Sequence, residues 1–207
     1  ARNTERLQDT LSALEGKGHS YIAADLTDAT QRTALVEQLP ALHGVVHCAG
    51  VGSRVPCKML TQEDLDYVMK PNAEAPILLQ AELLSEKKIA KQASIVFVAS
   101  AAASMPSAGN AAYSASKAAI IAYAKCLAQE LAPRLIRVNS ISPAMVWTDL
   151  ALVGASAEQL TEAEKQYPLK RYGQPQDIAH LAVYMLSDAS GWMTGSDVQI
   201  TGGSQML

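Results

Sequence analysis

The sequence predicts an α/β fold in which helices cover both faces of a doubly wound parallel sheet. Short apolar runs alternate with longer segments of helical apolar spacing along all 207 residues. The run Ile-Val-Phe-Val at residues 95–98 lacks polar alternation, which is typical of a strand buried on both faces. This alternation implies right-handed crossovers, and we expect a single domain over residues 1–207 because no linker or repeat interrupts it.

The individual elements follow from apolar spacing and from local start signals. The expected strands are the short apolar and β-branched runs Tyr21–Leu26, Gly44–Ala49, Ser94–Ala99, Leu135–Ser142 and Val198–Thr201. The expected helices have apolar residues three or four positions apart and span Thr4–Leu14, Asp28–Gln38, Thr61–Ser85, Asn110–Ala132 and Pro175–Leu186. Thr61 is followed by Asp64 at capping distance, and Pro175 suits a first helical turn with Asp177 close behind.

Two prolines interrupt the third expected helix. Pro71 and Pro76 each remove a backbone donor, so we expect this helix to kink near Asn72. Asn72 is then a polar side chain beside loosened backbone. Its position alone leaves open whether it is a structural polar bridge or a site residue.

Composition excludes several classes of protein. The chain is 49% hydrophobic and 18% charged with a net charge of −3, which argues against disorder and against a nucleic-acid-binding surface. No apolar run approaches the ~18 residues that a membrane span needs. Three cysteines without C-x-x-C spacing indicate neither a disulfide framework nor a metal site, so we expect no metal and a reducing cytoplasmic location.

The carboxyl ends of the expected strands carry informative residues. Ligands of doubly wound sheets bind outside these ends. Ala49-Gly50 follows the second strand and is small enough for a ligand to approach the backbone. Ser100 follows the third strand, and the segment from Pro143 to Thr148 follows the fourth.

Tyr113 and Lys117 lie four residues apart on the helix that follows Ser100, so their side chains project from the same helix face. An ammonium beside a phenol favours the phenolate, and we expect Lys117 to lower the pKa of Tyr113 towards neutral pH. That pKa would suit general acid–base catalysis. The Y-x-x-x-K pattern is common, however, and a chance pair on a helix surface is the alternative.

Taken together, these features resemble the short-chain dehydrogenase/reductase family. The resemblance rests on Asn72, on Ser100 thirteen residues before Tyr113, and on Lys117. Further matches lie in the segments 137–143, 148–149, 168–177, 194–195 and 201–203. The resemblance covers essentially the whole chain in the right order, and it is greatest for single-domain reductases of the 3-oxoacyl-carrier-protein reductase kind.

This resemblance implies a Rossmann-type fold and an oxidoreductase. A hydride would pass between NADPH and a carbonyl or secondary alcohol carried on a partly apolar small molecule. Tyr113 would exchange a proton with the substrate oxygen, Lys117 would lower its pKa and hold the nicotinamide ribose, and Ser100 would hydrogen-bond the carbonyl. Asn72 would hold a water that links Lys117 to solvent. Two alternatives remain: a non-catalytic dinucleotide-binding sensor or assembly subunit, and, more weakly, a nucleotide-sugar epimerase or dehydratase.

The resemblance also implies a cofactor-binding set. Its members are Arg2, Asp25, Leu26, Ala49, Gly50, Tyr113, Lys117, Pro143, Val146 and Thr148. Asp25 and Leu26 would border the adenine, Ala49 and Gly50 the adenosine ribose, and Val146 and Thr148 the carboxamide. Arg2 would accommodate the 2′-phosphate, so NADPH is expected and NAD is less favoured. A solvated arginine at a helix start is the alternative for Arg2.

Met145, Trp147 and a segment over about residues 149–168 are expected to form the substrate-side wall. Ala151, Leu152, Val153 and Gly154 make this segment apolar. For Trp147, core packing is an equal alternative. Relatives commonly associate through their two long helices, so a homotetramer or homodimer is expected.

Several positions depart from the family pattern. The glycine-rich T-G-x-x-x-G-x-G turn, with its strand, its helix and most of the next strand, is missing before Ala1, and we expect the natural chain to have residues there. Pro71 directly precedes Asn72. His47-Cys48 stands in place of two asparagines, Ala144 in place of a glycine and Thr201 in place of an aspartate.

Overall fold

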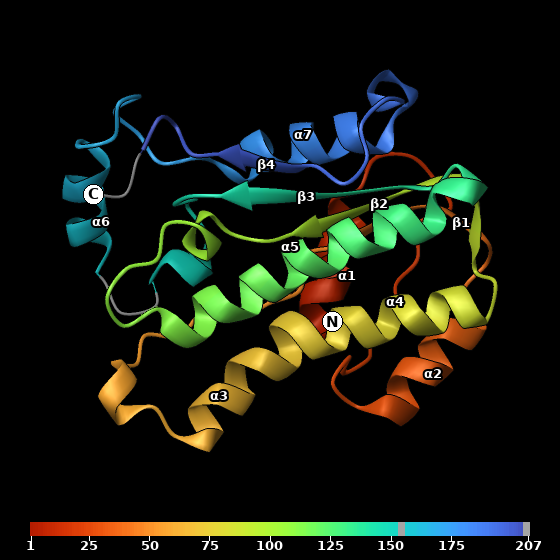
Figure 1. Cartoon of the computed structure of the whole chain (residues 1–207), viewed down its shortest axis with the longest axis horizontal. Coiled ribbons are helices and arrows are strands. Elements are labelled where there is room, and N and C mark those ends of the chain that lie inside the picture. The colour runs from red at the N-terminus through yellow and green to blue at the C-terminus, as the bar shows by residue number, and fades with distance from the viewer. Residues whose placement is uncertain (153–155, 205–207) are drawn as a thin grey trace.

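The computed structural model describes residues 1–152 and 156–204. At its centre is a parallel sheet in the order β1-β2-β3-β4 (Figure 1). Its strands are β1 (Leu42–His47), β2 (Ile89–Val98), β3 (Arg137–Pro143) and β4 (Asp197–Ile200). This sheet and its flanking helices confirm the predicted α/β, Rossmann-type fold class.

Helices pack on both faces of the sheet. The described helices are α1 (Thr4–Ala13), α2 (Ala29–Gln38), α3 (Gln62–Met69), α4 (Ala75–Ser85), α5 (Ala111–Leu131), α6 (Ala157–Glu164) and α7 (Pro175–Leu186). Short 3₁₀ turns cover Cys57–Met59, Ala101–Ala103, Ala132–Arg134, Asp149–Leu152 and Asp188–Ser190. Ile95 and Phe97 of β2 pack with α4 and α5, whereas Val96 packs with α7, because alternate side chains of a strand point to opposite faces. Each helix in the described part of the chain is too short or too polar to span a bilayer.

The interruption predicted near Asn72 is a five-residue π-helical turn over Lys70–Glu74, between α3 and α4. The N–H of Ala75 donates to the carbonyl of Lys70 five residues earlier, which is the spacing of a π-helix. Pro71 lies inside this turn and has no backbone N–H to donate. The turn buries Asn72, which is 1% exposed. The capping box predicted from Thr61 and Asp64 is present at the start of α3.

The strand predicted over Tyr21–Leu26 is not formed, and this prediction was wrong. In the described part of the chain β1 is the outer strand of the sheet, and no strand pairs with residues 21–26. A segment without a neighbouring strand cannot form the hydrogen bonds of a sheet. Ala24 donates its N–H to the carbonyl of Ala1 at 2.9 Å, and Asp25 donates its N–H to the Gln31 side chain at 2.9 Å. An apolar run can favour an extended backbone, but only a neighbouring strand makes it part of a sheet.

β2 begins five residues before its predicted start, because the sequence pattern does not reveal a bulge. Leu42 of β1 faces Ile89, whereas Gly44, only two residues on, faces Ser94. Gln92, at φ 61°, lies inside this irregular stretch. The remaining predicted strands and helices are present, and their ends coincide with the predicted ends or differ from them by one or two residues.

Arg137, at the start of β3, holds the far end of α7. Its Nη1 donates to the carbonyls of Met185 and Ser190 at 2.9 and 3.1 Å, and to the Ser190 hydroxyl at 2.7 Å. Its Nη2 donates to the carbonyl of Ser187 at 3.0 Å. A cation here satisfies carbonyls that a helix end leaves without partners, so Arg137 ties α7 to the sheet.

Replacing Arg137 by Met should therefore lower the free energy of unfolding by roughly 2 to 3 kcal/mol, because several carbonyls lose a charged donor. Urea unfolding followed by circular dichroism measures the change. Arg6→Met is the matched control: Arg6 and its partner Asp149 have side chains 78% and 90% exposed, and its loss should cost less than about 0.5 kcal/mol. Equal effects of the two substitutions would contradict the role given to Arg137.

Candidate active site

Ser100 lies two residues beyond the end of β2. It caps the 3₁₀ turn Ala101–Ala103, and its hydroxyl oxygen accepts the N–H of Ala102 at 3.2 Å. Serine favours this position because its short side chain can reach the first free N–H groups of a helical turn. The cap therefore fixes the hydroxyl at the carboxyl end of the sheet.

Tyr113 and Lys117 occupy the first turns of α5, directly after this segment. The Lys117 side chain is buried, and its Nζ donates to the carbonyl of Val98, the last residue of β2, at 2.9 Å. The same Nζ lies 5.9 Å from the centroid of the Tyr113 ring. The Ser100 hydroxyl is close enough to the Tyr113 phenol to lower its pKa by a hydrogen bond. The structure thus brings Ser100, Tyr113 and Lys117 together, as the strand order and the four-residue spacing predict.

Burial dominates the electrostatics of this group. It lowers the pKa of Lys117 to about 8. Burial also raises the pKa of Tyr113, and the Ser100 hydrogen bond only partly opposes it. The expected lowering of the Tyr113 pKa is therefore wrong for the chain by itself, because the cost of withdrawing the phenolate from water outweighs the Ser100 hydrogen bond.

Asn72 connects the loop after β1 to α5. Its Oδ1 accepts the N–H of Val51 at 2.7 Å, and its Nδ2 donates to the carbonyl of Val51 at 2.9 Å and to Ser116 Oγ at 3.2 Å. The Ser116 hydroxyl in turn donates to the carbonyl of Tyr113 at 2.7 Å. Asn72 is thus a structural polar bridge in this structure, and the bridge ends at the residue that carries the phenol. The sequence reading did not single out Ser116, although it lies within the Tyr113–Lys117 segment.

Ala49 and Gly50 are exposed and lie beside the buried polar group. A Cβ on Gly50 would lie 3.1 Å from Asn72 Oδ1 and 3.4 Å from Lys117 Nζ. A side chain here would displace one of these groups, so the absence of a Cβ is what allows the loop to lie against Lys117.

Arg2 and Asp25, both predicted to bind cofactor, contact one another. Arg2 Nη1 lies 3.3 Å from Asp25 Oδ2, and the Arg2 side chain is 76% exposed. Hydrogen bonds from the Thr27 hydroxyl and N–H lower the pKa of Asp25, with a smaller contribution from Arg2. Leu26 packs against the core, and its carbonyl accepts Arg32 Nη1 at 3.0 Å.

The segment after β3 is pinned to a distant part of the chain. Pro143 ends β3 opposite Ile200 of β4. Beyond it, the carbonyl of Met145 accepts the N–H of Gly173 at 3.0 Å, and the N–H of Trp147 donates to the carbonyl of Gly173 at 2.9 Å. Val146 thereby forms an isolated parallel bridge with Gly173.

The side chains of this segment differ in exposure. Thr148 is exposed, and its hydroxyl makes a long hydrogen bond of 3.4 Å to the carbonyl of Val146. Trp147 is half-buried and donates its indole N–H to Glu164 Oε2 at 2.8 Å. Of the predicted apolar wall, Ala151 and Leu152 lie in a 3₁₀ turn, whereas Val153 and Gly154 lie outside the described residues.

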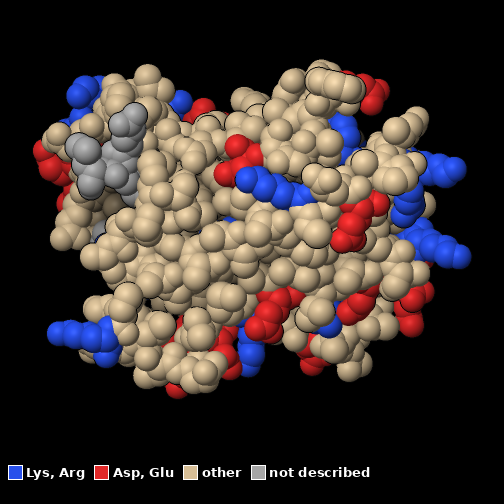
Figure 2. Space-filling model, in the orientation of Figure 1, with Lys and Arg blue, Asp and Glu red and all other residues tan. Residues whose placement is uncertain are grey.

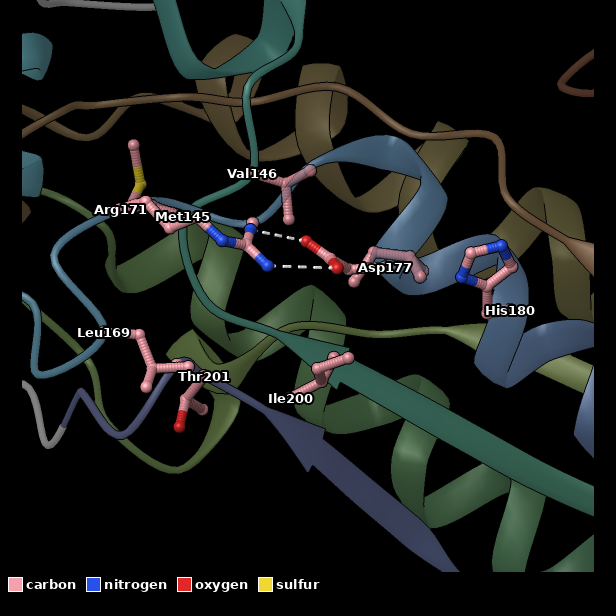
Figure 3. Close-up of a pocket in the computed structure, with 11 residues that line it drawn as sticks. Met145, Val146, Leu169, Arg171, Asp177, His180, Ile200 and Thr201 are labelled. Carbon is pink, nitrogen blue, oxygen red and sulfur yellow. Dashed lines mark hydrogen bonds and ion pairs between the residues drawn. The ribbon is translucent and has the colours of Figure 1, made fainter.

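A hollow of about 230 Å³ lies beside Met145 and Val146, and Figure 3 shows the residues that line it. Arg171 spans it and pairs with Asp177 through two hydrogen bonds of 2.7 and 3.2 Å. The Arg171 guanidinium lowers the pKa of Asp177 to about 2. Ser100, Tyr113 and Lys117 do not line this hollow, so it is separate from the candidate acid–base group.

Comparisons with known proteins identify the family of the chain. Residues 1–205 match the sequence profile of a family described as enoyl-(acyl carrier protein) reductase. L-xylulose reductase of Caenorhabditis elegans is 33% identical over 165 residues, which are 78% of this chain but 65% of that relative's length. The 3-oxoacyl-[acyl-carrier-protein] reductase FabG of Chlamydia pneumoniae is 31% identical over 97% of this chain and 83% of its own.

Among solved structures, a short-chain dehydrogenase/reductase from Brucella melitensis superposes with a TM-score of 0.89. It is 28% identical in sequence and covers 99% of this chain and 84% of its own. The sequence match, the shared fold and the grouping of Ser100, Tyr113 and Lys117 lead to one conclusion: the chain belongs to the short-chain dehydrogenase/reductase family of NAD(P)-dependent oxidoreductases.

Proposed function

We propose that this chain transfers a hydride between NADPH and the carbonyl or secondary alcohol group of a partly apolar small molecule. The observation that carries the proposal is the convergence of Ser100, Tyr113 and Lys117 at the end of β2. A hydroxyl, a phenol and an ammonium in one group can hydrogen-bond a carbonyl oxygen, protonate it and stabilise the phenolate that results.

In the direction of reduction, Tyr113 donates its proton to the carbonyl oxygen while the carbonyl carbon gains a hydride. Its raised pKa keeps the phenol protonated before the reaction, so a proton is available to give. Ser100 stabilises the negative charge that develops on the substrate oxygen. The Lys117 ammonium then attracts the phenolate, and Asn72 positions α5 through Ser116. The nicotinamide cofactor supplies or accepts the hydride.

The described residues fit a nicotinamide cofactor. An ammonium carries three donors, and Lys117 gives one of them to Val98, so the other two suit the hydroxyls of a ribose. The exposed Ala49-Gly50 backbone would lie along the adenosine ribose, with Asp25 and Leu26 at the adenine. Pro143, Val146 and Thr148 would border the carboxamide. Met145 and Trp147 would face the substrate, and their apolar surfaces support a partly apolar substrate.

The preference for NADPH rests on Arg2. Its exposed guanidinium can reach a 2′-phosphate, and phosphate is the ligand that such a planar donor recognises best. Asp25 beside it carries an opposing charge, so the phosphate would compete with this carboxylate for Arg2.

We also propose that the chain acts in the cytoplasm as a homotetramer or homodimer. Figure 2 shows an almost uncharged band along α5, the long helix labelled in Figure 1. Tyr67 of α3 and Leu78 of α4 are 59% and 44% exposed, and apolar side chains of this kind suit a subunit contact.

Replacing Tyr113 by Phe should lower the turnover number roughly a thousandfold, because general acid–base catalysis contributes about 10²- to 10⁴-fold. NADPH oxidation with a panel of ketones, oxoacyl thioesters and hydroxysteroids measures it. Tyr123→Phe, a half-buried tyrosine on the same helix, is the matched control and should change turnover less than about threefold. If the wild type binds NADPH but turns over none of these substrates, the alternative of a non-catalytic dinucleotide-binding sensor is favoured instead.

Stability should depend on pH through Lys117. Its pKa is about 8 in the folded chain and near 10.5 when exposed, so between these values the unfolded chain binds one more proton. The free energy of unfolding of the wild type, minus that of Lys117→Met, should therefore rise with pH from 8 to 10, by up to about 1.4 kcal/mol per unit. Lys125→Met, at an exposed position of α5, should show no such difference. A flat or falling difference for Lys117→Met would refute the burial argument.

Replacing Arg2 by Ala should lower the catalytic efficiency with NADPH roughly tenfold and leave that with NADH nearly unchanged, because only NADPH offers a 2′-phosphate. Steady-state kinetics with both cofactors measures this. Arg6→Ala, at an exposed arginine of helix α1 just after Arg2, is the control. A tenfold preference of the wild type for NADH would overturn the assignment.

A further inference from the structure

We propose that Glu164 is a positioning residue that holds the substrate-side segment Met145–Trp147 in place. The inference rests on the proposed function, because this segment is where that function places the carbonyl substrate. Glu164 touches neither Ser100, Tyr113 nor Lys117 in the described contacts, so it would act through Trp147.

A single oxygen of Glu164 joins three parts of the chain. Oε2 accepts the indole N–H of Trp147 at 2.8 Å and the backbone N–H of Tyr172 at 3.2 Å. Glu164 itself is the last residue of α6. The carboxylate thus connects the loop after β3, the end of α6 and the segment that leads into α7. Hydrogen bonds to an ionised acceptor are stronger than those between neutral groups, which makes this a firm junction.

Aromatic packing shields the junction. Tyr172 is 3% exposed, and its ring centroid lies 5.6 Å from that of Trp147 and 4.9 Å from that of Tyr167. Leu160, one turn earlier on α6, is also buried. In such surroundings the indole N–H needs an acceptor, and Glu164 is the acceptor that the fold provides.

The junction transmits position to the candidate site through the backbone. Trp147 and Met145 are both hydrogen-bonded to Gly173, and Gly173 follows Tyr172 directly. Val146 and Gly173 form the β-bridge between these two segments. Glu164 therefore holds the side chain of Trp147, next to Val146, and the backbone of Tyr172, next to Gly173. Without the carboxylate, the indole N–H loses its acceptor. The segment Met145–Trp147 is then held only by its backbone hydrogen bonds to Gly173.

The same helix offers a matched control. Glu162 lies two residues earlier and pairs with Lys165, and their side chains are 71% and 60% exposed. Glu162→Ala removes the same carboxylate from the same helix without touching Trp147.

The kinetic test compares Glu164→Ala, Glu164→Gln and Glu162→Ala. Glu164→Ala should raise the KM for the carbonyl substrate roughly tenfold, with kcat changed less than about threefold, because it disturbs ground-state binding and leaves the acid–base group intact. Glu164→Gln keeps an acceptor oxygen and should restore most of the KM. A purely structural role would lower the active fraction, and hence kcat, at unchanged KM. An unchanged KM in Glu164→Ala, or an equal rise in Glu162→Ala, overturns the proposal.

A second measurement needs no turnover. The chain has two tryptophans, and Trp192 is fully exposed, so Trp192→Phe leaves the emission of Trp147 alone. In that background Glu164→Ala should move the emission to longer wavelength, because water replaces the carboxylate at the indole N–H. Glu164→Gln and Glu162→Ala should leave it near the parent. An unshifted emission in Glu164→Ala overturns the proposal, whereas a wild type that reduces no carbonyl compound overturns only the proposed function.

If Glu164→Ala does not fold, Trp147→Phe tests the same junction by removing the donor. It should raise the KM for the carbonyl substrate to a similar extent. Where both variants fold, the double variant should be little worse than either single one, because both break one interaction. Additive effects would show that the two residues act independently, and would overturn the proposal.

Discussion

The buried ammonium of Lys117 is the constraint on which the rest of the site depends. A charge withdrawn from water must find partners, and Lys117 finds one in the carbonyl that ends β2. That bond fixes the first turns of α5 against the tip of the sheet. Tyr113 and the loop at Gly50 take their places around the same nitrogen. The sheet edge, the helix and the loop therefore share one point of attachment, and it coincides with the acid–base group.

Local chemistry made much of this arrangement predictable. Thr61 and Pro175 mark the starts of α3 and α7, and the two prolines around Asn72 foretell an interruption of the helix. The spacing of Tyr113 and Lys117 requires only that their segment be helical. Since the carboxyl ends of parallel strands lie at one edge, the position of Ser100 followed from the strand order.

What sequence reasoning missed depends on distant partners or on burial. The Tyr21–Leu26 run has the composition of a strand, but pairing is decided by what lies beside it. The direction of the Tyr113 pKa shift depends on the balance of desolvation and charge, which spacing does not reveal. The contact between Glu164 and Trp147 joins residues seventeen positions apart through a loop whose path has no sequence signature.

The π-helical turn at Lys70–Glu74 has a consequence for how this chain can vary. Each residue of an α-helix rotates the chain by about 100°, and the turn holds one residue more than a regular helix would. Removing that residue would rotate α3 against α4, so that Val68 and Leu83 could no longer both face the interior. Asn72 would also turn away from Val51. The number of residues in this turn therefore sets the direction in which the Asn72 side-chain amide points. Substitutions in the turn should be tolerated more readily than insertions or deletions.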